Sequence, residues 1–105
     1  MSARAYTRPL AVVLGLNGAY PITTMEGYMT VIRCVDVYWG GGVLPVDFYL
    51  KGSAGQTIWH QAFAVGGGTW AQWRGRQAIG SLEAWELHTN DPMDVTVTGY
   101  ELEDR

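Results

Sequence analysis

The C-terminal half of this chain alternates short β-like runs with turn signals, and it carries four of the five tryptophans. Residues 82–88 (LEAWELH) and 93–102 (MDVTVTGYEL) have the alternating, β-branched and aromatic character of strands. Between them, residues 89–92 (TNDP) are turn formers, so the pattern predicts one antiparallel hairpin. Residues 70–79 (WAQWRGRQAI) add a further strand candidate. Apolar positions repeat every two residues and not every 3.6, which predicts an all-β fold.

The N-terminal half continues this pattern. Residues 10–16 (LAVVLGL) predict a first, buried strand that ends at the turn dipeptide 17–18 (NG). Residues 28–39 form the longest run, apolar on both alternating faces, as in a central strand of a packed sheet. Residues 43–50 and 56–63 alternate cleanly around a GSAG turn and predict a hairpin. About seven strands at this spacing favour a single antiparallel β-sandwich, jelly-roll-like in form.

The length of 105 residues fits one domain, which we expect to occupy residues 10–105. Residues 1–9 (MSARAYTRP) are polar and basic and end in a proline, which predicts an extended arm ordered against a neighbouring chain. The apolar run at 10–16 is too short to span a bilayer, and no small-residue cleavage site follows it. We therefore expect a protein made in the cytoplasm without processing.

Composition indicates an interaction protein. Charged residues make up 16% of the chain, against roughly 25% in an average domain, and the 14 glycines are about twice the usual share. Such a chain exposes neutral or apolar surface, which often marks an interface with other chains. The net charge of −3 argues against nucleic acid as a partner, because nucleic-acid binders carry a basic stripe. The single Cys34 excludes a disulfide framework within the chain.

No catalytic, cofactor or metal site is predicted. Glu83 and Glu86 are three residues apart and would point to opposite faces of a strand, so they could not act as a catalytic pair. His60 and His88 lack the spacing of a metal-ligand pair. Ser53 lies in a glycine-rich turn without the following helix of a nucleophile elbow.

Trp70 and Trp73 are the side chains whose role is most open. They are three residues apart, so one should enter the core while the other lies at the surface. An exposed indole could anchor a protein interface or stack on a sugar. Trp59 and Trp85 share faces with apolar residues and are assigned to the core.

Arg74 and Arg76 flank Gly75 on one face of the same predicted strand. Two guanidinium groups on one face could bind a carboxylate of a neighbouring subunit. The alternative is a solvated strand face without a partner.

The order of three motifs resembles a known family. A W-x-x-W-R-G-R motif (70–76) is followed by G-S-L-E (80–83) and by V-T-V-T-G-Y-E-L (95–102). This arrangement resembles small β-sandwich virion proteins of tailed bacteriophages, especially phages of actinobacteria, over roughly residues 45–102. The resemblance is one of pattern and not of exact motif.

The resemblance implies a structural role in the virion without catalysis or cofactors, as a capsid decoration or accessory subunit or as a small tail protein. It also implies assembly with copies of the chain, as a trimer or larger ring, and with other virion proteins, but not with membranes. The contact residues we expect are Tyr6, Arg8, Trp70, Arg74 and Arg76.

Two other functions stay open. A carbohydrate- or receptor-binding module would use Trp70 or Trp73 and would present exposed, coplanar rings. An enzyme would need a pocket that brings His60 or His88 together with acidic residues.

Overall fold

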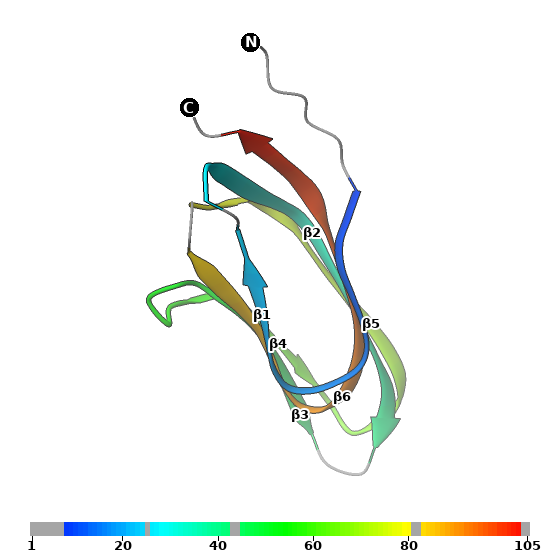
Figure 1. The fold of residues 1–105 in the computed structure, drawn as a ribbon. Helices are drawn as coiled ribbons and strands as arrows, with labels where there is room; N and C mark the ends of the chain where they lie inside the picture. The colour runs from blue at the N-terminus through cyan, green and yellow to red at the C-terminus, as the bar shows by residue number, and fades with distance from the viewer. Residues whose placement is uncertain (1–7, 25, 43–44, 81–82, 104–105) are drawn as a thin grey trace.

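The computed structural model describes residues 8–24, 26–42, 45–80 and 83–103, and these form six β-strands and no helix (Figure 1). The strands are β1 (Arg8–Thr23), β2 (Tyr28–Gly42), β3 (Val46–Lys51), β4 (Thr57–Phe63), β5 (Gly66–Ile79) and β6 (Ala84–Glu103). No helix in this part of the chain is long and apolar enough to cross a membrane. The predicted all-β class is confirmed. The described residues form six strands instead of the roughly seven expected, and four of them are longer than predicted.

Two long antiparallel strands, β1 and β6, belong to both layers of the fold. They pair from Arg8 opposite Gly99 to Thr23 opposite Ala84. On its other side, β6 pairs with β2 over residues 94–103 and with β3 over residues 86–89. With β5 added to β2 and β4 added to β3, one layer is β1–β6–β2–β5 and the other is β1–β6–β3–β4. The predicted antiparallel β-sandwich is confirmed, and it is built from a single sheet that folds over itself until it is nearly closed (Figure 1).

The predicted hairpin around residues 89–92 is wrong. Residues 84–103 are one continuous strand, and its two halves both pair with β1 and not with each other. The pairing steps from Leu16 opposite Met93 to Gly18 opposite Thr89, so β6 carries extra residues at a bulge. The turn-forming residues therefore mark a corner, where the β1–β6 pair passes from one layer to the other.

The first strand likewise does not end at residue 16. It continues through the predicted turn to Thr23. The backbone bends at the corner through Gly15 and Gly18, whose φ angles are 68° and 103°. These left-handed backbone conformations are easily adopted only by glycine. The strand is also not buried as predicted, because Val12 and Leu14 are exposed.

The predicted hairpin between residues 43–50 and 56–63 is confirmed as β3 and β4, which pair from Val46 opposite Phe63 to Lys51 opposite Thr57. The turn is closed by two backbone hydrogen bonds, from Gly52 N to Gln56 O at 2.8 Å and from Gly55 N to Gly52 O at 3.0 Å.

Strand β2 is central in its layer, as predicted, but its simple alternation is wrong. Arg33 forms a bulge, because Ile32 lies opposite Gly99 whereas Cys34 lies opposite the adjacent Thr98. Upstream of the bulge Ile32 faces the core, and downstream Val35 faces it. Cys34 consequently points outward, on the face opposite to that of Ile32.

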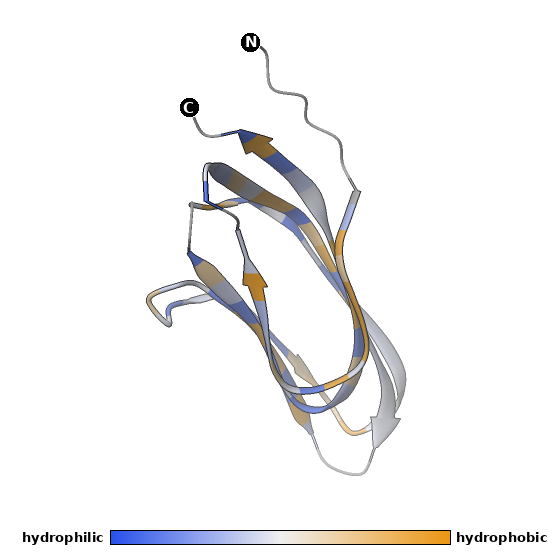
Figure 2. Ribbon diagram, viewed as in Figure 1, coloured by the Kyte–Doolittle hydropathy of each residue, from blue (hydrophilic) through white to orange (hydrophobic). Residues whose placement is uncertain are grey.

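The core lies between the two layers, and Figure 2 shows alternating hydrophilic and hydrophobic bands along the strands that enclose it. Trp39 contacts Phe63 across the layers at a ring distance of 5.9 Å. Of the tryptophans assigned to the core, Trp85 is buried, and Trp59 is partly buried and packs on Phe48 at 5.5 Å.

Candidate functional site

The outer surface of the β1–β6–β2–β5 layer is the candidate site. Because Val35, Val37, Val95 and Val97 point into the core, the residues that alternate with them point away from it. No other described strand packs over these side chains. The set, called here the β5–β1 face, consists of Trp70, Gln72 and Arg74 on β5, Cys34, Asp36 and Tyr38 on β2, Asp94, Thr96 and Thr98 on β6, and Val12 and Leu14 on β1.

Large apolar side chains lie at both edges of the β5–β1 face. On β5, Trp70 is 72% exposed and contacts the Tyr38 ring at 4.8 Å, with an angle of 46° between the ring planes. On β1, at the other edge, Val12 is 59% and Leu14 is 78% exposed. Trp73 is partly buried and packs against the core, so the predicted division between a core-facing and an exposed tryptophan is confirmed.

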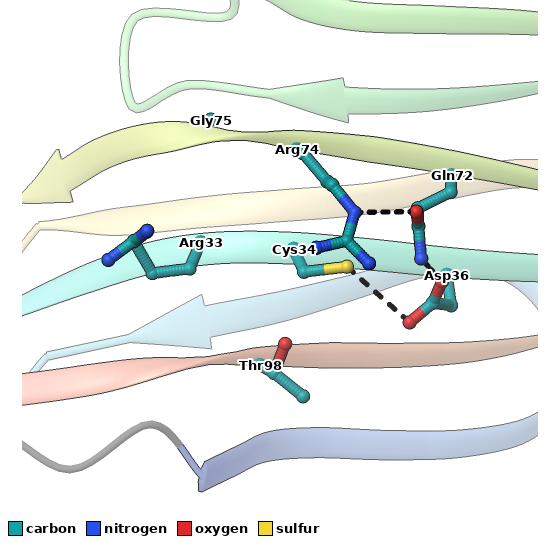
Figure 3. Close-up of a pocket in the computed structure, with 7 residues that line it drawn as sticks. All are labelled: Arg33, Cys34, Asp36, Gln72, Arg74, Gly75 and Thr98. Atoms are coloured by element: carbon teal, nitrogen blue, oxygen red, sulfur yellow. Dashed lines mark hydrogen bonds between the residues drawn. The ribbon is translucent and has the colours of Figure 1, made fainter.

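The middle of the face is a polar groove (Figure 3). The Arg74 Nε donates to Gln72 Oε1 at 2.7 Å, and Gln72 Nε2 in turn donates to Asp36 Oδ1. The Cys34 thiol donates to Asp36 Oδ2 at 3.5 Å. Arg74 is thus linked to the Asp36 carboxylate through Gln72, by two successive hydrogen bonds that run from β5 to β2.

Burial and the hydrogen bond to Asp36 raise the pKa of the Cys34 thiol above its usual value. Desolvation opposes the thiolate, and the carboxylate both accepts the thiol proton and repels a second negative charge. Cys34 is therefore a protonated side chain at neutral pH and not an activated nucleophile.

Arg76 lies on the same outer surface as Arg74 but is held by a different partner. Its Nε and one terminal nitrogen donate to the Tyr100 hydroxyl at 3.1 and 2.6 Å. The tyrosine is buried, so it fixes the position of the guanidinium. The two arginines are both exposed.

The remaining predicted contact residues are Tyr6 and Arg8. Tyr6 and the rest of residues 1–7 of the predicted arm lie outside the described residues. Arg8 is the first residue of β1, and its Cα lies opposite that of Gly99.

The outer surface of the second layer has a different character. His60 Nε2 is hydrogen bonded to Asp47 Oδ1 at 2.8 Å, and its ring stacks on Tyr49 at 4.5 Å. His88 lies on the other side of Tyr49 at 6.2 Å, and the Lys51 Nζ lies 5.3 Å from the same ring. Asp47, His60 and Tyr49 interact with one another, whereas the buried His88 Nδ1 has no hydrogen-bond partner among the described residues. Within the described ranges no three potential metal ligands gather.

Sequence reasoning missed Val12, Leu14 and Tyr38 as surface residues. Their apolar character favoured a core assignment, and no local signal distinguishes an exposed apolar residue from a buried one. Only the pairing of strands from distant parts of the sequence brings them onto the surface that carries Trp70.

No protein-family model and no curated protein matches this sequence. Among solved structures, the chain is similar to one in "Structure of infectious bursal disease virus Gx strain", with a TM-score of 0.40, 14% identity, and coverage of 99% of this chain and 34% of that one. For "Structure of infectious bursal disease virus Gt strain" the TM-score is 0.32, the identity 16%, and the coverage 95% and 32%. This chain thus spans about a third of those chains, and at this similarity neither comparison assigns it a function.

Proposed function

We propose that the protein is a non-enzymatic structural component of a virion, acting through protein–protein contacts with copies of itself and with other virion proteins. In its finer form the proposal is a tailed-phage particle, with the chain as a capsid decoration or accessory subunit or as a small tail protein. The pattern of residues 45–102 supports the assignment to a virion.

The observation that carries an assembly role is the β5–β1 face. Trp70, Val12 and Leu14 expose large apolar surfaces on one side of a sheet, around a polar centre. Interface cores are enriched in aromatic side chains and arginine. Trp and Arg are also the residue types that most often contribute strongly to binding.

A carbohydrate-binding module is less well supported by the geometry. Such a module would present a flat platform of coplanar rings, but Trp73 packs against the core and the Tyr38 ring is tilted by 46° from Trp70. A single exposed indole can stack on a sugar, so glycan binding is the alternative hypothesis in the test of assembly.

The test is the solution mass by light scattering of the full chain and of a form without residues 1–7, which leaves β1 intact. We expect a trimer or larger species that loosens on truncation. A monomer in both forms, together with tryptophan fluorescence that changes on addition of sugars, would overturn the proposal in favour of the module.

A further inference from the structure

We propose that the polar groove of the β5–β1 face binds an acidic side chain of another virion protein, through the guanidinium groups of Arg33 and Arg74. This inference rests on the proposed function and names the chemistry of the partner. It differs from the pairing of Arg74 with Arg76 that the sequence suggested, because the arginine that lines the groove together with Arg74 is Arg33 (Figure 3).

The bulge in β2 brings Arg33 into the groove. Adjacent residues of a regular strand point to opposite faces of the sheet, yet Arg33 and Cys34 both line this groove. The cause is that Arg33 is the extra residue of the bulge, between Ile32 and Cys34. Bulges reorient side chains in this way and are frequent next to functional sites.

Both guanidinium groups have nitrogens available for a ligand. Arg33 is exposed, and its guanidinium has no hydrogen-bond or ion-pair partner among the described residues. The Arg74 Nε donates to Gln72 Oε1, whereas its two terminal nitrogens have no partner in the described part of the chain. Arg76 is different, because the Tyr100 hydroxyl already accepts from its guanidinium. A carboxylate accepts hydrogen bonds from such groups in a planar, paired geometry, so Arg33 and Arg74 are the arginines that suit it.

Asp36 is the carboxylate that lines the groove, and it does not neutralise both arginines. Its Oδ1 accepts from Gln72 and its Oδ2 from Cys34. In Figure 3 it lies at the opposite end of the groove from Arg33, with Cys34 between them. The lining thus contains two arginines, one carboxylate and a protonated thiol, which gives an excess of positive charge in a chain whose net charge is −3. The groove therefore favours an anion at the end that Arg33 occupies.

The surroundings of Cys34 indicate where in the groove a negative charge is stabilised. Burial and Asp36 raise the pKa of its thiol, whereas a hydrogen bond with Thr98 and the charge of Arg74 act in the opposite direction. These last two groups would stabilise a bound carboxylate for the same reason that they stabilise a thiolate. The carboxylate position that we infer thus lies beside Cys34, between Arg33 and Arg74, with the Thr98 hydroxyl as a further donor.

The setting of the groove favours a protein partner over a free anion. An exposed ion pair in water contributes little to binding. Trp70 at one edge of the face and Leu14 at the other are exposed apolar groups, which only a larger partner can cover together with the groove. Such a partner would also remove water from the groove, and this would strengthen the contact between its carboxylate and the arginines.

Nuclear magnetic resonance titration tests the site with a defined probe. The probe is an N-acetylated peptide amide with one glutamate between two leucines, and the matched peptide has glutamine in its place. We expect saturable shifts of the Cys34 and Gly75 amide signals, with several-fold tighter binding of the glutamate peptide. Arg33→Gln and Arg74→Gln should each weaken that binding several-fold. The control is Lys51→Gln, which removes a positive charge from β3 in the other layer and should bind like the wild type.

Alkylation of Cys34 gives a second readout that does not require tight binding. Its rate with iodoacetate, which carries a carboxylate, is divided by its rate with neutral iodoacetamide, so that a change in the thiol pKa cancels. We expect this ratio to fall several-fold in Arg33→Gln and in Arg74→Gln and to stay unchanged in Lys51→Gln. The same ratio in all of these proteins would overturn the site.

The titration has two further outcomes that would count against the proposal. Equal binding of the two peptides, or an equal loss in Lys51→Gln, would overturn the carboxylate site. Acetate or inorganic phosphate that binds as tightly as the glutamate peptide would overturn the assignment to a protein partner. The solution mass of the unmodified chain tests the proposed function separately, so a failed titration with an intact oligomer would remove the site and leave that function standing.

Discussion

The indole Nε1 of Trp39 in β2 donates a hydrogen bond to Asp91 Oδ2 in the corner of β6, at 2.8 Å. The neighbouring Asn90 Oδ1 accepts from the backbone N–H of Asp47 in β3 at 2.9 Å. The corner is therefore attached to one strand of each layer. The turn-forming side chains at residues 89–92 do not reverse the chain; they fix the place where β6 changes layer.

Replacing Asp91 with alanine should destabilise the fold. Trp39 is 1% exposed, so its N–H would lose its partner without gaining full access to water, at a cost of about 1–3 kcal/mol. The Asp91→Asn variant keeps a carbonyl acceptor and should lose less. Denaturant unfolding of the two variants checks this, and equal losses would show that the hydrogen bond is not what holds the corner.

Replacing Gly99 with alanine should be strongly destabilising. A Cβ at this position would lie 1.9 Å from the Val31 carbonyl oxygen, and because that atom is backbone, relief requires the strands to separate. Overpacking of this kind costs about 1–3 kcal/mol or more.

The matched control for this substitution is Gly40→Ala, where an added Cβ meets nothing within 4 Å. Its unfolding free energy should stay within about 1 kcal/mol of the wild type. Thermal unfolding in which both variants behave alike would contradict the close approach of β2 and β6.

Trp70 and Trp73 should respond oppositely to truncation. Trp70→Ala should change the unfolding free energy by no more than about 0.5 kcal/mol, because the side chain is exposed, but should reduce self-association. Trp73→Ala should cost about 2 kcal/mol or more, because the ring packs against the core. Paired unfolding and light-scattering measurements check this, and a Trp70→Ala variant that assembles like wild type would argue against the β5–β1 face.

Alkylation of Cys34 should require a higher pH than alkylation of a free cysteine. Its pKa is raised by burial and by Asp36, so the thiolate fraction at a given pH is lower than usual. In an Asp36→Asn variant the midpoint of the pH–rate profile should move down, while the contribution of burial stays. An unchanged midpoint in that variant would exclude the carboxylate as a cause.

The sequence predicted well those features that depend on neighbouring residues. The β3–β4 hairpin needs only two alternating runs and a short turn, and the opposite orientations of Trp70 and Trp73 need only an unbroken strand. The alternation of β2 failed at Arg33, because a bulge is set by the partners of the strand and not by its own residues.

The candidate site depended on contacts between distant segments and could not be found this way. Asn17-Gly18 and residues 89–92 are residue types that favour a bend of the backbone, and they suit a corner between layers as well as a hairpin turn. What distinguishes the corner from a hairpin turn is that β1 pairs with β6 on both sides of it, from Ala84 to Gly99, which no local pattern encodes. For the same reason Val12 and Leu14 could not be placed on a surface with Trp70.

The pairing of β1 with β6 also sets the order of events during synthesis. The ribosome releases β1 before the other five described strands, but its partner β6 emerges after all of them. Neither layer can be completed until β6 has emerged, so folding of these strands has to follow its release, and such long-range pairing is slow. Until that moment the apolar segment around Leu14 stays without its partner strand, which exposes the nascent chain to aggregation or to capture by chaperones.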